Sequence, residues 1–198
     1  MKRILVAIIL SLCVVLPARA GPVESLTLEA GPRTVVYGDS VELRGVLSPP
    51  SAADRVTVLA LPYHGGSISA DADPDPDGSW RLSFTPLVTT QFRAVAGGID
   101  SAETPVVSVR PRVHLVVLSA RRGLFYTRVE ALIGYRGRTA AFQLLGRRGW
   151  RTLKYVTLGP NAAVRFRADL RRRARVRVTV AAGSGYARGV SRTALVRS

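Results

Sequence analysis

The sequence has very little cysteine, histidine or lysine. Its 198 residues include one cysteine, two histidines and two lysines, Lys2 and Lys154. A zinc site usually takes three or four cysteine or histidine ligands, so no transition-metal site is expected. The single cysteine, Cys13, lies in the apolar N-terminal segment. The rest of the chain must fold without a disulfide, which requires domains large enough to bury a hydrophobic core.

Catalytic motifs are also scarce. Gly38-Asp39-Ser40 matches the opening triplet of the GDSL-type secreted esterases. The triad of that class needs an aspartate three residues before its histidine, and neither His64 nor His114 has one there. We therefore expect no enzymatic activity. Gly38-Asp39 instead indicates a turn between two strands.

Long apolar runs are confined to the N-terminus. Two basic residues precede an apolar stretch over residues 4–16, and a small-x-small triplet follows at residues 18–20. This stretch is too short to span a bilayer, and the pattern is typical of a cleaved secretory signal. A lipid anchor at Cys13 is the alternative, although Leu12 stands where processing needs a small residue. We expect residues 1–20 to be removed and the product to be secreted or held at the cell envelope, without a transmembrane segment.

The formal net charge of +16 is unevenly distributed. Residues 21–112 contain 7 arginines and 11 acidic residues, whereas residues 113–198 contain 19 lysines and arginines against Glu130 and Asp169. This asymmetry indicates an anionic partner for the second half. An exported protein rarely meets nucleic acid in its natural setting. The expected partner is therefore an anionic cell-wall polymer or an acidic polysaccharide.

Apolar and polar residues alternate along most of the chain, whereas a helical period is almost absent. The alternation is clear in SVELRGVL, RVTVLAL, SWRLSF and ARVRVTVA. Short runs of this kind, separated by Gly, Pro, Asp and Ser, are typical of antiparallel β-sandwiches. The sequence therefore predicts an all-β protein.

The sequence also repeats itself at one constant offset. The matching segments are Trp80–Phe84 with Val164–Ala168, Phe92–Val95 with Val176–Thr179, and Val56–Leu61 with Ala140–Leu145. Toward the ends the offset drifts, with Val41-Glu42 matched to Val129-Glu130 and Ser101 to Ser191. A constant offset over several strands indicates a duplicated unit. We expect an acidic domain at residues 21–110 and a strongly basic domain at residues 113–198, joined stiffly at Pro111.

Three segments resemble a known family of domains. VVYGDSVELRGVL in the first unit, and GRTAAFQLLGRRGWRTL and VRVTVAAGSGYARGVSRTALV in the second, are similar to the immunoglobulin-like repeats of secreted actinobacterial proteins. The resemblance covers most of residues 25–198. It implies two tandem immunoglobulin-like antiparallel β-sandwiches after the signal peptide. It also implies a structural, spacer or binding module without catalysis.

Two segments of the basic half place arginines at every second position. Arg165 and Arg167 alternate with apolar residues in AVRFRAD, and Arg175 and Arg177 do so in ARVRVTV. If these segments pair as a β-hairpin, all four guanidinium groups lie side by side on the outer face. Guanidinium groups suit phosphate, sulfate and carboxylate, so we predict these arginines to be the ligand-binding residues. A GC-rich genome, or protection of strands against aggregation, is the alternative explanation of the arginine excess.

The acidic half contains the segment DPDPDG, which begins at Asp73 and matches the opening of a calcium loop. Phe84 stands at position twelve, where such a loop needs a bidentate carboxylate, and Asp-Gly is a strong signal for a hairpin turn. A solvated acidic turn is the favoured interpretation. Calcium bound by Asp73, Asp75 and Asp77 is the alternative, and no other cofactor is expected. In a third interpretation, residues 71–77 dock on the basic domain.

The two tryptophans are predicted to differ in role. Trp80 alternates with apolar residues and is expected in a core. Trp150 shares its parity with Thr152 and Lys154, opposite to Tyr155. It therefore either packs on an edge strand or stacks on a sugar. Together with the aspartate segment, it suggests an alternative function as a calcium-dependent carbohydrate-binding accessory module.

Overall fold

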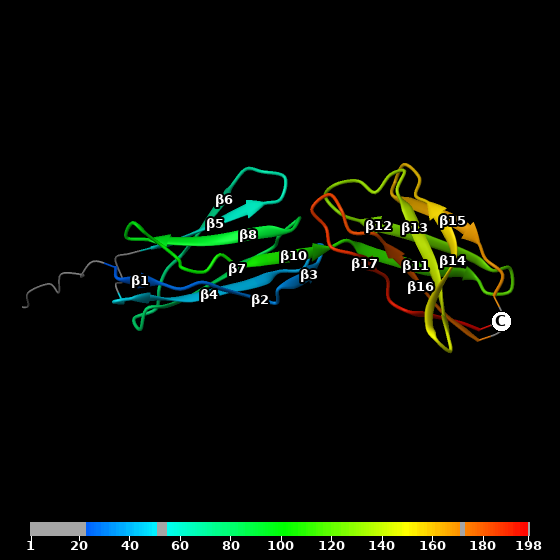
Figure 1. The fold of residues 1–198 in the computed structure, drawn as a ribbon, viewed down its shortest axis with the longest axis horizontal. Coiled ribbons are helices and arrows are strands. Elements are labelled where there is room, and N and C mark those ends of the chain that lie inside the picture. The colour runs from blue at the N-terminus through cyan, green and yellow to red at the C-terminus, as the bar shows by residue number, and fades with distance from the viewer. Residues whose placement is uncertain (1–22, 51–54, 171–172, 198) are drawn as a thin grey trace, which may run out of the picture.

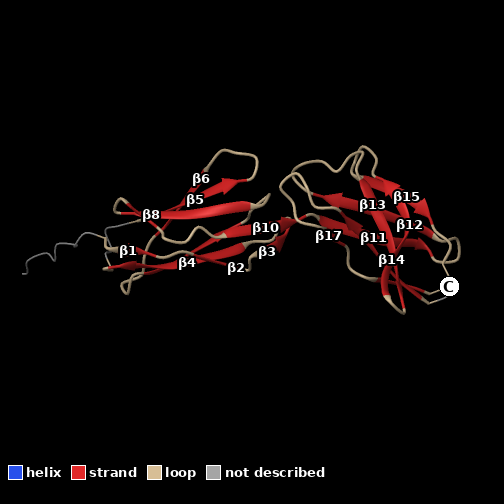
Figure 2. Cartoon of the chain, in the orientation of Figure 1, coloured by secondary structure: helices blue, strands red, loops and turns tan. Residues whose placement is uncertain are grey.

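The computed structural model describes residues 23–50, 55–170 and 173–197 (Figure 1). All regular structure in these ranges is β-strand, which confirms the prediction of an all-β protein (Figure 2). The predicted signal at residues 1–20, with Cys13, lies outside the described residues. Within them, no helix is long and apolar enough to cross a membrane.

The first sandwich, domain 1, consists of two sheets. In one sheet β1 and β2 pair along one edge of β4, and β7 pairs along the other edge. The second sheet has the order β3-β10-β8-β5-β6, with β9 also on β8 and with β3 parallel to β10. The strands are β1 (Ser25–Leu26), β2 (Glu29–Gly31), β3 (Thr34–Val36), β4 (Val41–Ser48), β5 (Val56–Pro62), β6 (Ile68–Ala72), β7 (Ser79–Phe84), β8 (Thr90–Ala96), β9 (Ile99–Asp100) and β10 (Val106–Arg110).

The second sandwich, domain 2, follows directly after Pro111. One sheet has the order β11-β12-β15, and the other has the order β14-β13-β16-β17, with β18 also on β16. The strands are β11 (Arg112–Ser119), β12 (Leu124–Glu130), β13 (Thr139–Gly146), β14 (Gly149–Thr157), β15 (Ala163–Arg167), β16 (Ala174–Val180), β17 (Gly189–Val190) and β18 (Ala194–Val196).

The strand order of both sandwiches is that of the immunoglobulin fold. In domain 2 the first, second and fifth strands form one sheet, and the third, fourth, sixth, seventh and last strands form the other. Domain 1 divides its strands in the same way, with the additional parallel strand β3 beside β10. Such a division requires Greek-key connections that cross between the sheets. The predicted fold class, two tandem immunoglobulin-like sandwiches, is therefore confirmed.

Two buried serines show that the domains are equivalent. The Ser101 hydroxyl accepts a hydrogen bond from the Ala94 amide at 3.1 Å, and the Ser191 hydroxyl accepts one from the Val178 amide at 2.9 Å. Ala94 in β8 and Val178 in β16 are matched by the constant offset of the repeat. The match of Ser101 with Ser191 is thus confirmed.

The proposed match of Val41-Glu42 with Val129-Glu130 is wrong. In domain 1, Leu43 lies opposite Leu82, and in domain 2 the corresponding neighbours are Phe125 and Phe166. Leu82 and Phe166 are matched by the constant offset, so Leu43 corresponds to Phe125. At this strand the offset between the two units is smaller than elsewhere, whereas a larger offset was predicted. The reason is that the connections around the second strand differ in length between the two domains. Side-chain alternation alone does not reveal such a difference.

Each sandwich buries aromatic side chains between its sheets. Trp80 is 1% exposed, as predicted for a core residue. In domain 2, Phe125, Phe142 and Phe166 form a cluster with ring centroids 4.8 to 5.6 Å apart. Burying each phenylalanine contributes roughly 1.5–3 kcal/mol to folding, and this contribution takes the place of a disulfide.

The two domains lie end to end and share a packed junction (Figure 1). Backbone hydrogen bonds cross it from the Thr89 amide to the Gly185 carbonyl and from the Ala187 amide to the Val109 carbonyl, each at 2.8 Å. The Tyr186 hydroxyl donates to the Leu87 carbonyl at 2.9 Å. These bonds tie domain 1 to the segment before β17.

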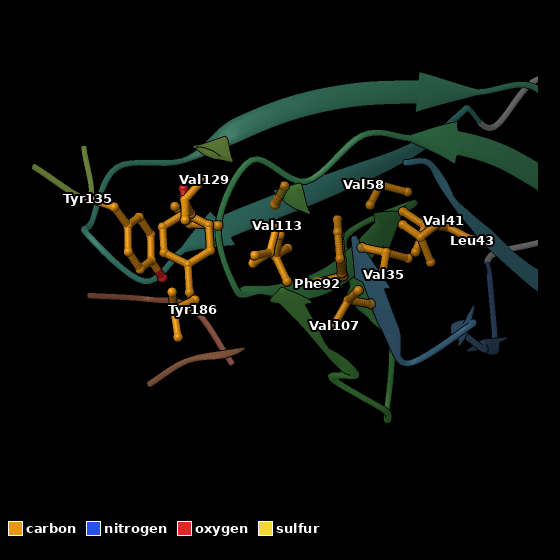
Figure 3. Close-up of a cluster of buried hydrophobic side chains, with 14 of the residues drawn as sticks. Val35, Val41, Leu43, Val58, Phe92, Val107, Val113, Val129, Tyr135 and Tyr186 are labelled. Atoms are coloured by element: carbon orange, nitrogen blue, oxygen red, sulfur yellow. The ribbon is translucent and has the colours of Figure 1, made fainter. Parts of the chain in front are cut away.

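Buried side chains continue through this junction from one sandwich into the other (Figure 3). Tyr135 and Tyr186 are 2% and 4% exposed, with ring centroids 6.0 Å apart. On the outside, the Arg112 guanidinium donates to Asp39 at 2.6 Å and to the Tyr37 carbonyl at 3.0 Å. The contact therefore has an apolar centre and a polar rim.

Candidate anion-binding surfaces of domain 2

The four predicted arginines do not share one surface. Strand β15, with Arg165 and Arg167, pairs with β12, whereas β16, with Arg175 and Arg177, pairs with β13. The two strands belong to opposite sheets, so the predicted hairpin is wrong. In the immunoglobulin order the connection after the fifth strand crosses to the other sheet, about 10 Å away. The arginines therefore face outward on opposite sides of domain 2.

The outer face of the three-stranded sheet carries Arg165 and Arg167. Both side chains are exposed, and Arg165 lies beside Tyr126 in the neighbouring strand. The only acidic residue on this face, Glu130, contacts His114 at 3.3 Å and Arg128 at 3.6 Å. Neither Arg165 nor Arg167 forms an ion pair with a carboxylate in the described ranges, so both are available to an external anion.

The outer face of the five-stranded sheet uses its two arginines differently. Arg175 is exposed, whereas the Arg177 guanidinium lies over the Trp150 ring, 4.2 Å from its centroid. Arg177 Nε also donates to the Gln143 side-chain carbonyl at 2.9 Å. Partial burial lowers the pKa of Arg177, and the nearby charge of Arg188 lowers it further. Arg177 is thus engaged within the protein.

A β-bulge changes which side chains share this face. Thr152 lies opposite Gln143 and Lys154 lies opposite Phe142, so Leu153 is an extra residue in β14. Beyond the bulge the alternation is reversed, and Tyr155 faces outward with Trp150. The prediction that Tyr155 points away from Trp150 is wrong for this reason. Tyr155 is 68% exposed, whereas the Trp150 ring is half-buried under Arg177.

The aspartate segment of domain 1 forms the predicted hairpin turn. Asp77 accepts hydrogen bonds from the Ser79 amide at 2.9 Å and the Ser79 hydroxyl at 2.7 Å, and both bonds lower the pKa of its carboxyl group. Gly78 has a φ of +82°, and a Cβ there would overlap the Leu47 carbonyl oxygen, so only glycine fits. The Asp73 carboxylate instead forms an ion pair with Arg55 at 3.0 Å.

No three acidic, histidine or cysteine side chains come together to hold a metal ion anywhere in residues 23–50, 55–170 and 173–197. Asp73, Asp75 and Asp77 are therefore not brought to one point, and a calcium ion there stays a prediction. The segment lies at the end of domain 1 that faces away from domain 2 (Figure 1). Docking of residues 71–77 on the basic domain of the same chain is thus wrong.

The esterase-like triplet has structural contacts. Gly38 has a φ of +87° and the Asp39 amide donates to the Val36 carbonyl, which confirms the predicted turn. The Asp39 carboxylate pairs with Arg112, and the Ser40 hydroxyl bonds to that of Thr85 at 2.8 Å. These side chains hold the turn and the domain junction.

Four exposed arginines in two turns of domain 2, Arg121, Arg122, Arg147 and Arg148, were missed at the level of sequence. Arg121 and Arg122 lie in the turn between β11 and β12, Arg147 and Arg148 in the turn between β13 and β14, and Arg173 precedes β16. We call these five residues the basic end. Adjacent arginines recur along the sequence in turns that are separated from one another by two strands. This recurrence is the signal that identifies them.

Comparison with known proteins adds little to this description. No protein-family model and no curated protein matches the chain. A tetra-tandem repeat in the extending region of a large adhesion protein is 14% identical over 87% of this chain and 49% of that chain, with a TM-score of 0.40. The human OSCAR ligand-binding domain is 13% identical over 89% of this chain and 100% of that chain, with a TM-score of 0.32. The fold assignment therefore rests on the strand order.

Proposed function

We propose that the protein is a non-catalytic module of the cell exterior in which domain 2 binds an anionic polymer and domain 1 acts as a spacer. The observation that carries the proposal is the segregation of charge between two sandwiches of the same fold. Residues 113–198 contain 19 basic and two acidic residues, whereas residues 21–112 are mildly acidic. Because both domains have the same architecture, folding alone does not require this difference.

The physical basis is electrostatic. Guanidinium groups that share one protein surface repel one another weakly in water, and less in salt. A polyanion removes this repulsion and releases its own counterions when it binds, so affinity falls steeply as salt rises. Arginine forms two parallel hydrogen bonds with a phosphate, sulfate or carboxylate group, which suits a cell-wall polymer or an acidic polysaccharide.

The role of domain 1 follows from the junction. Hydrogen bonds from Thr89 and Ala187 and the buried Tyr186 ring join the domains end to end. A junction of this kind holds domain 2 at a constant distance from whatever domain 1 contacts. The acidic turn at the opposite end of domain 1 repels the same polymer, so the polymer binds at domain 2.

The proposal is tested by retention of the chain from residue 21 onward on heparin, polyphosphate and polygalacturonate supports in increasing salt. One variant removes three exposed arginines of domain 2, two in its turns and one on a sheet face: Arg122→Ser, Arg148→Ser and Arg165→Ser. Its control removes three from domain 1: Arg33→Ser, Arg44→Ser and Arg81→Ser. We expect elution at lower salt for the first variant only. Equal elution of both variants, or retention of the native chain that does not depend on salt, would overturn the proposal.

A second candidate function is binding of a carbohydrate by the outer face of the five-stranded sheet. The observation that favours it is Tyr155, 68% exposed and on the same face as Trp150. Aromatic rings stack on sugars, and this contact does not weaken with salt as ion pairs do. Binding of neutral oligosaccharides that is unaffected by salt and is lost in Tyr155→Ala supports this function. Loss of this binding on adding a chelator would further support a calcium-dependent carbohydrate-binding module.

A further inference from the structure

We infer that the polyanion is held mainly by the basic end of domain 2, and that the outer sheet faces contribute less. The inference rests on the proposed function, because it locates the binding site of the same ligand. The ligand chemistry is a linear polymer that bears phosphate or carboxylate groups at regular intervals.

The topology brings the three turns to one end of the sandwich. Each antiparallel strand reverses the direction of the chain, so turns separated by two strands lie at the same end. Strands β12 and β13 separate the first two turns, and β14 and β15 separate the second from the segment before β16. Figure 1 shows all three at the end of domain 2 that faces away from domain 1.

Direct contacts link these segments. The Ala168 amide donates to the Gly123 carbonyl at 2.9 Å, which ties the turn of Arg122 to the segment that leads to Arg173. Gly123 has a φ of +58°, and a Cβ there would overlap the Ala168 carbonyl oxygen, so the two segments touch.

The β13–β14 turn and the segment before β16 both border one shallow hollow of about 310 Å³. Leu145 and Arg151, on either side of the β13–β14 turn, line this hollow together with Asp169 and Arg173. The turn itself is tight, because Gly146 and Gly149 are paired. Arg147 and Arg148 are the two residues between them, so both side chains extend from the tip.

The charge of the basic end is less compensated than that of the sheet faces. All five of its arginines are exposed, and none forms an ion pair with a carboxylate in the part of the chain that the structure describes. Asp169 is the single acidic residue among the three segments. On the sheet faces, by contrast, Glu130 pairs with Arg128, and Arg177 is stacked on Trp150. Turn residues also project further than strand residues and meet an extended polymer first.

The test compares two variants that remove the same charge. The end variant carries Arg121→Ser, Arg122→Ser, Arg147→Ser and Arg148→Ser. The face variant carries Arg128→Ser, Arg165→Ser, Arg167→Ser and Arg175→Ser. Each lowers the net charge by four, so a non-specific effect of total charge is equal in both. The measurement is the dissociation constant for polyphosphate between about 0.05 and 0.3 M salt, with melting temperatures to confirm that both variants fold.

We expect the end variant to lose at least about tenfold in affinity, with a shallower dependence on salt, and the face variant to lose less than about threefold. An equal loss in both, or a larger loss in the face variant, would overturn the inference and leave the proposed function intact. If the native chain binds none of the supports, the proposed function itself fails. Parallel titrations with polygalacturonate and heparin distinguish a carboxylate or sulfate polymer from a phosphate polymer.

Discussion

The guanidinium group of Arg177 covers the indole ring of Trp150 at 4.2 Å, and Gln143 fixes its Nε with a hydrogen bond. The sequence presents the two residues as separate candidates, one for an anion and one for a sugar. In the structure they form one unit on the outer face of the five-stranded sheet. A ligand that uses the covered side of the Trp150 ring must therefore displace Arg177.

This relationship predicts the effect of removing Arg177 on tryptophan fluorescence. Arg177→Gln exposes the Trp150 ring, so its emission moves to longer wavelength and its quenching by acrylamide increases. The loss of the cation–π contact lowers the free energy of unfolding by about 0.5–1 kcal/mol. Arg175→Gln is the matched control, because Arg175 is exposed on the same strand. An identical spectrum for both variants would contradict the stacking.

The junction predicts a stabilising role for the Tyr186 hydroxyl, which donates to the Leu87 carbonyl and accepts from the Leu132 amide at 2.9 Å. Tyr186→Phe leaves both groups without a partner and lowers the free energy of unfolding by about 1–3 kcal/mol. Small-angle scattering detects the accompanying loss of a fixed orientation between the domains. Tyr63→Phe, at a side chain 67% exposed, is the control and leaves the scattering unchanged.

Tyr186 also predicts the behaviour of the junction at high pH. Burial raises the pKa of its phenol above the ordinary 10.0. A raised pKa means that the folded state favours the protonated form. Its contribution is complete below pH 10 and is lost as the pH rises through the higher pKa of the folded state. The melting temperature of the native chain therefore falls more steeply above pH 10 than that of Tyr186→Phe; parallel curves would count against this.

The turn at Asp77 predicts a dependence of stability on acid pH. Hydrogen bonds from Ser79 lower the pKa of the Asp77 carboxyl below 3.8, so the folded state favours the charged form. This contribution is present above pH 3.8 and is lost as the pH falls through the lower pKa of the folded state. Asp77→Ala removes it, so the melting temperatures of the native and variant chains differ at pH 6 and converge in acid. A constant difference would show that the carboxylate charge is irrelevant.

The same variant separates the turn from the calcium hypothesis. If the turn binds no calcium, Asp77→Ala lowers the stability by the same amount in calcium and in chelator. A bound ion raises the melting temperature of the native chain on adding calcium, by an amount that Asp77→Ala abolishes. Thermal unfolding in both solutions makes the comparison.

The equivalent serines predict matched effects in the two domains. Ser101→Ala leaves the Ala94 amide without its hydroxyl partner, and Ser191→Ala does the same to the Val178 amide. Each substitution lowers the stability of its own domain by about 1–3 kcal/mol. Calorimetry of the two variants checks the prediction. A large effect from one serine and none from the other would contradict their equivalence.

Alternation of side chains along the sequence was sufficient to predict the strands, the all-β class and much of the duplication. Trp80 was assigned to the core because a strand buries every second residue, and Asp77-Gly78 was assigned to a turn because the dipeptide favours one conformation. The charge difference between the halves was also visible, since charge depends on composition alone. Side-chain alternation, turn preference and charge are properties of short stretches of sequence, and they do not depend on contacts between distant segments.

Only the tertiary structure decided which strands are neighbours. The segments of Arg165 and Arg175 are adjacent in sequence, yet the connection between them crosses the sandwich, so their arginines face opposite ways. The bulge at Leu153 reversed the alternation that had separated Tyr155 from Trp150. Conversely, turns far apart in sequence gather their arginines at one end of domain 2. Strand pairing depends on contacts between distant segments, and the pattern within a single strand contains no information about its partner.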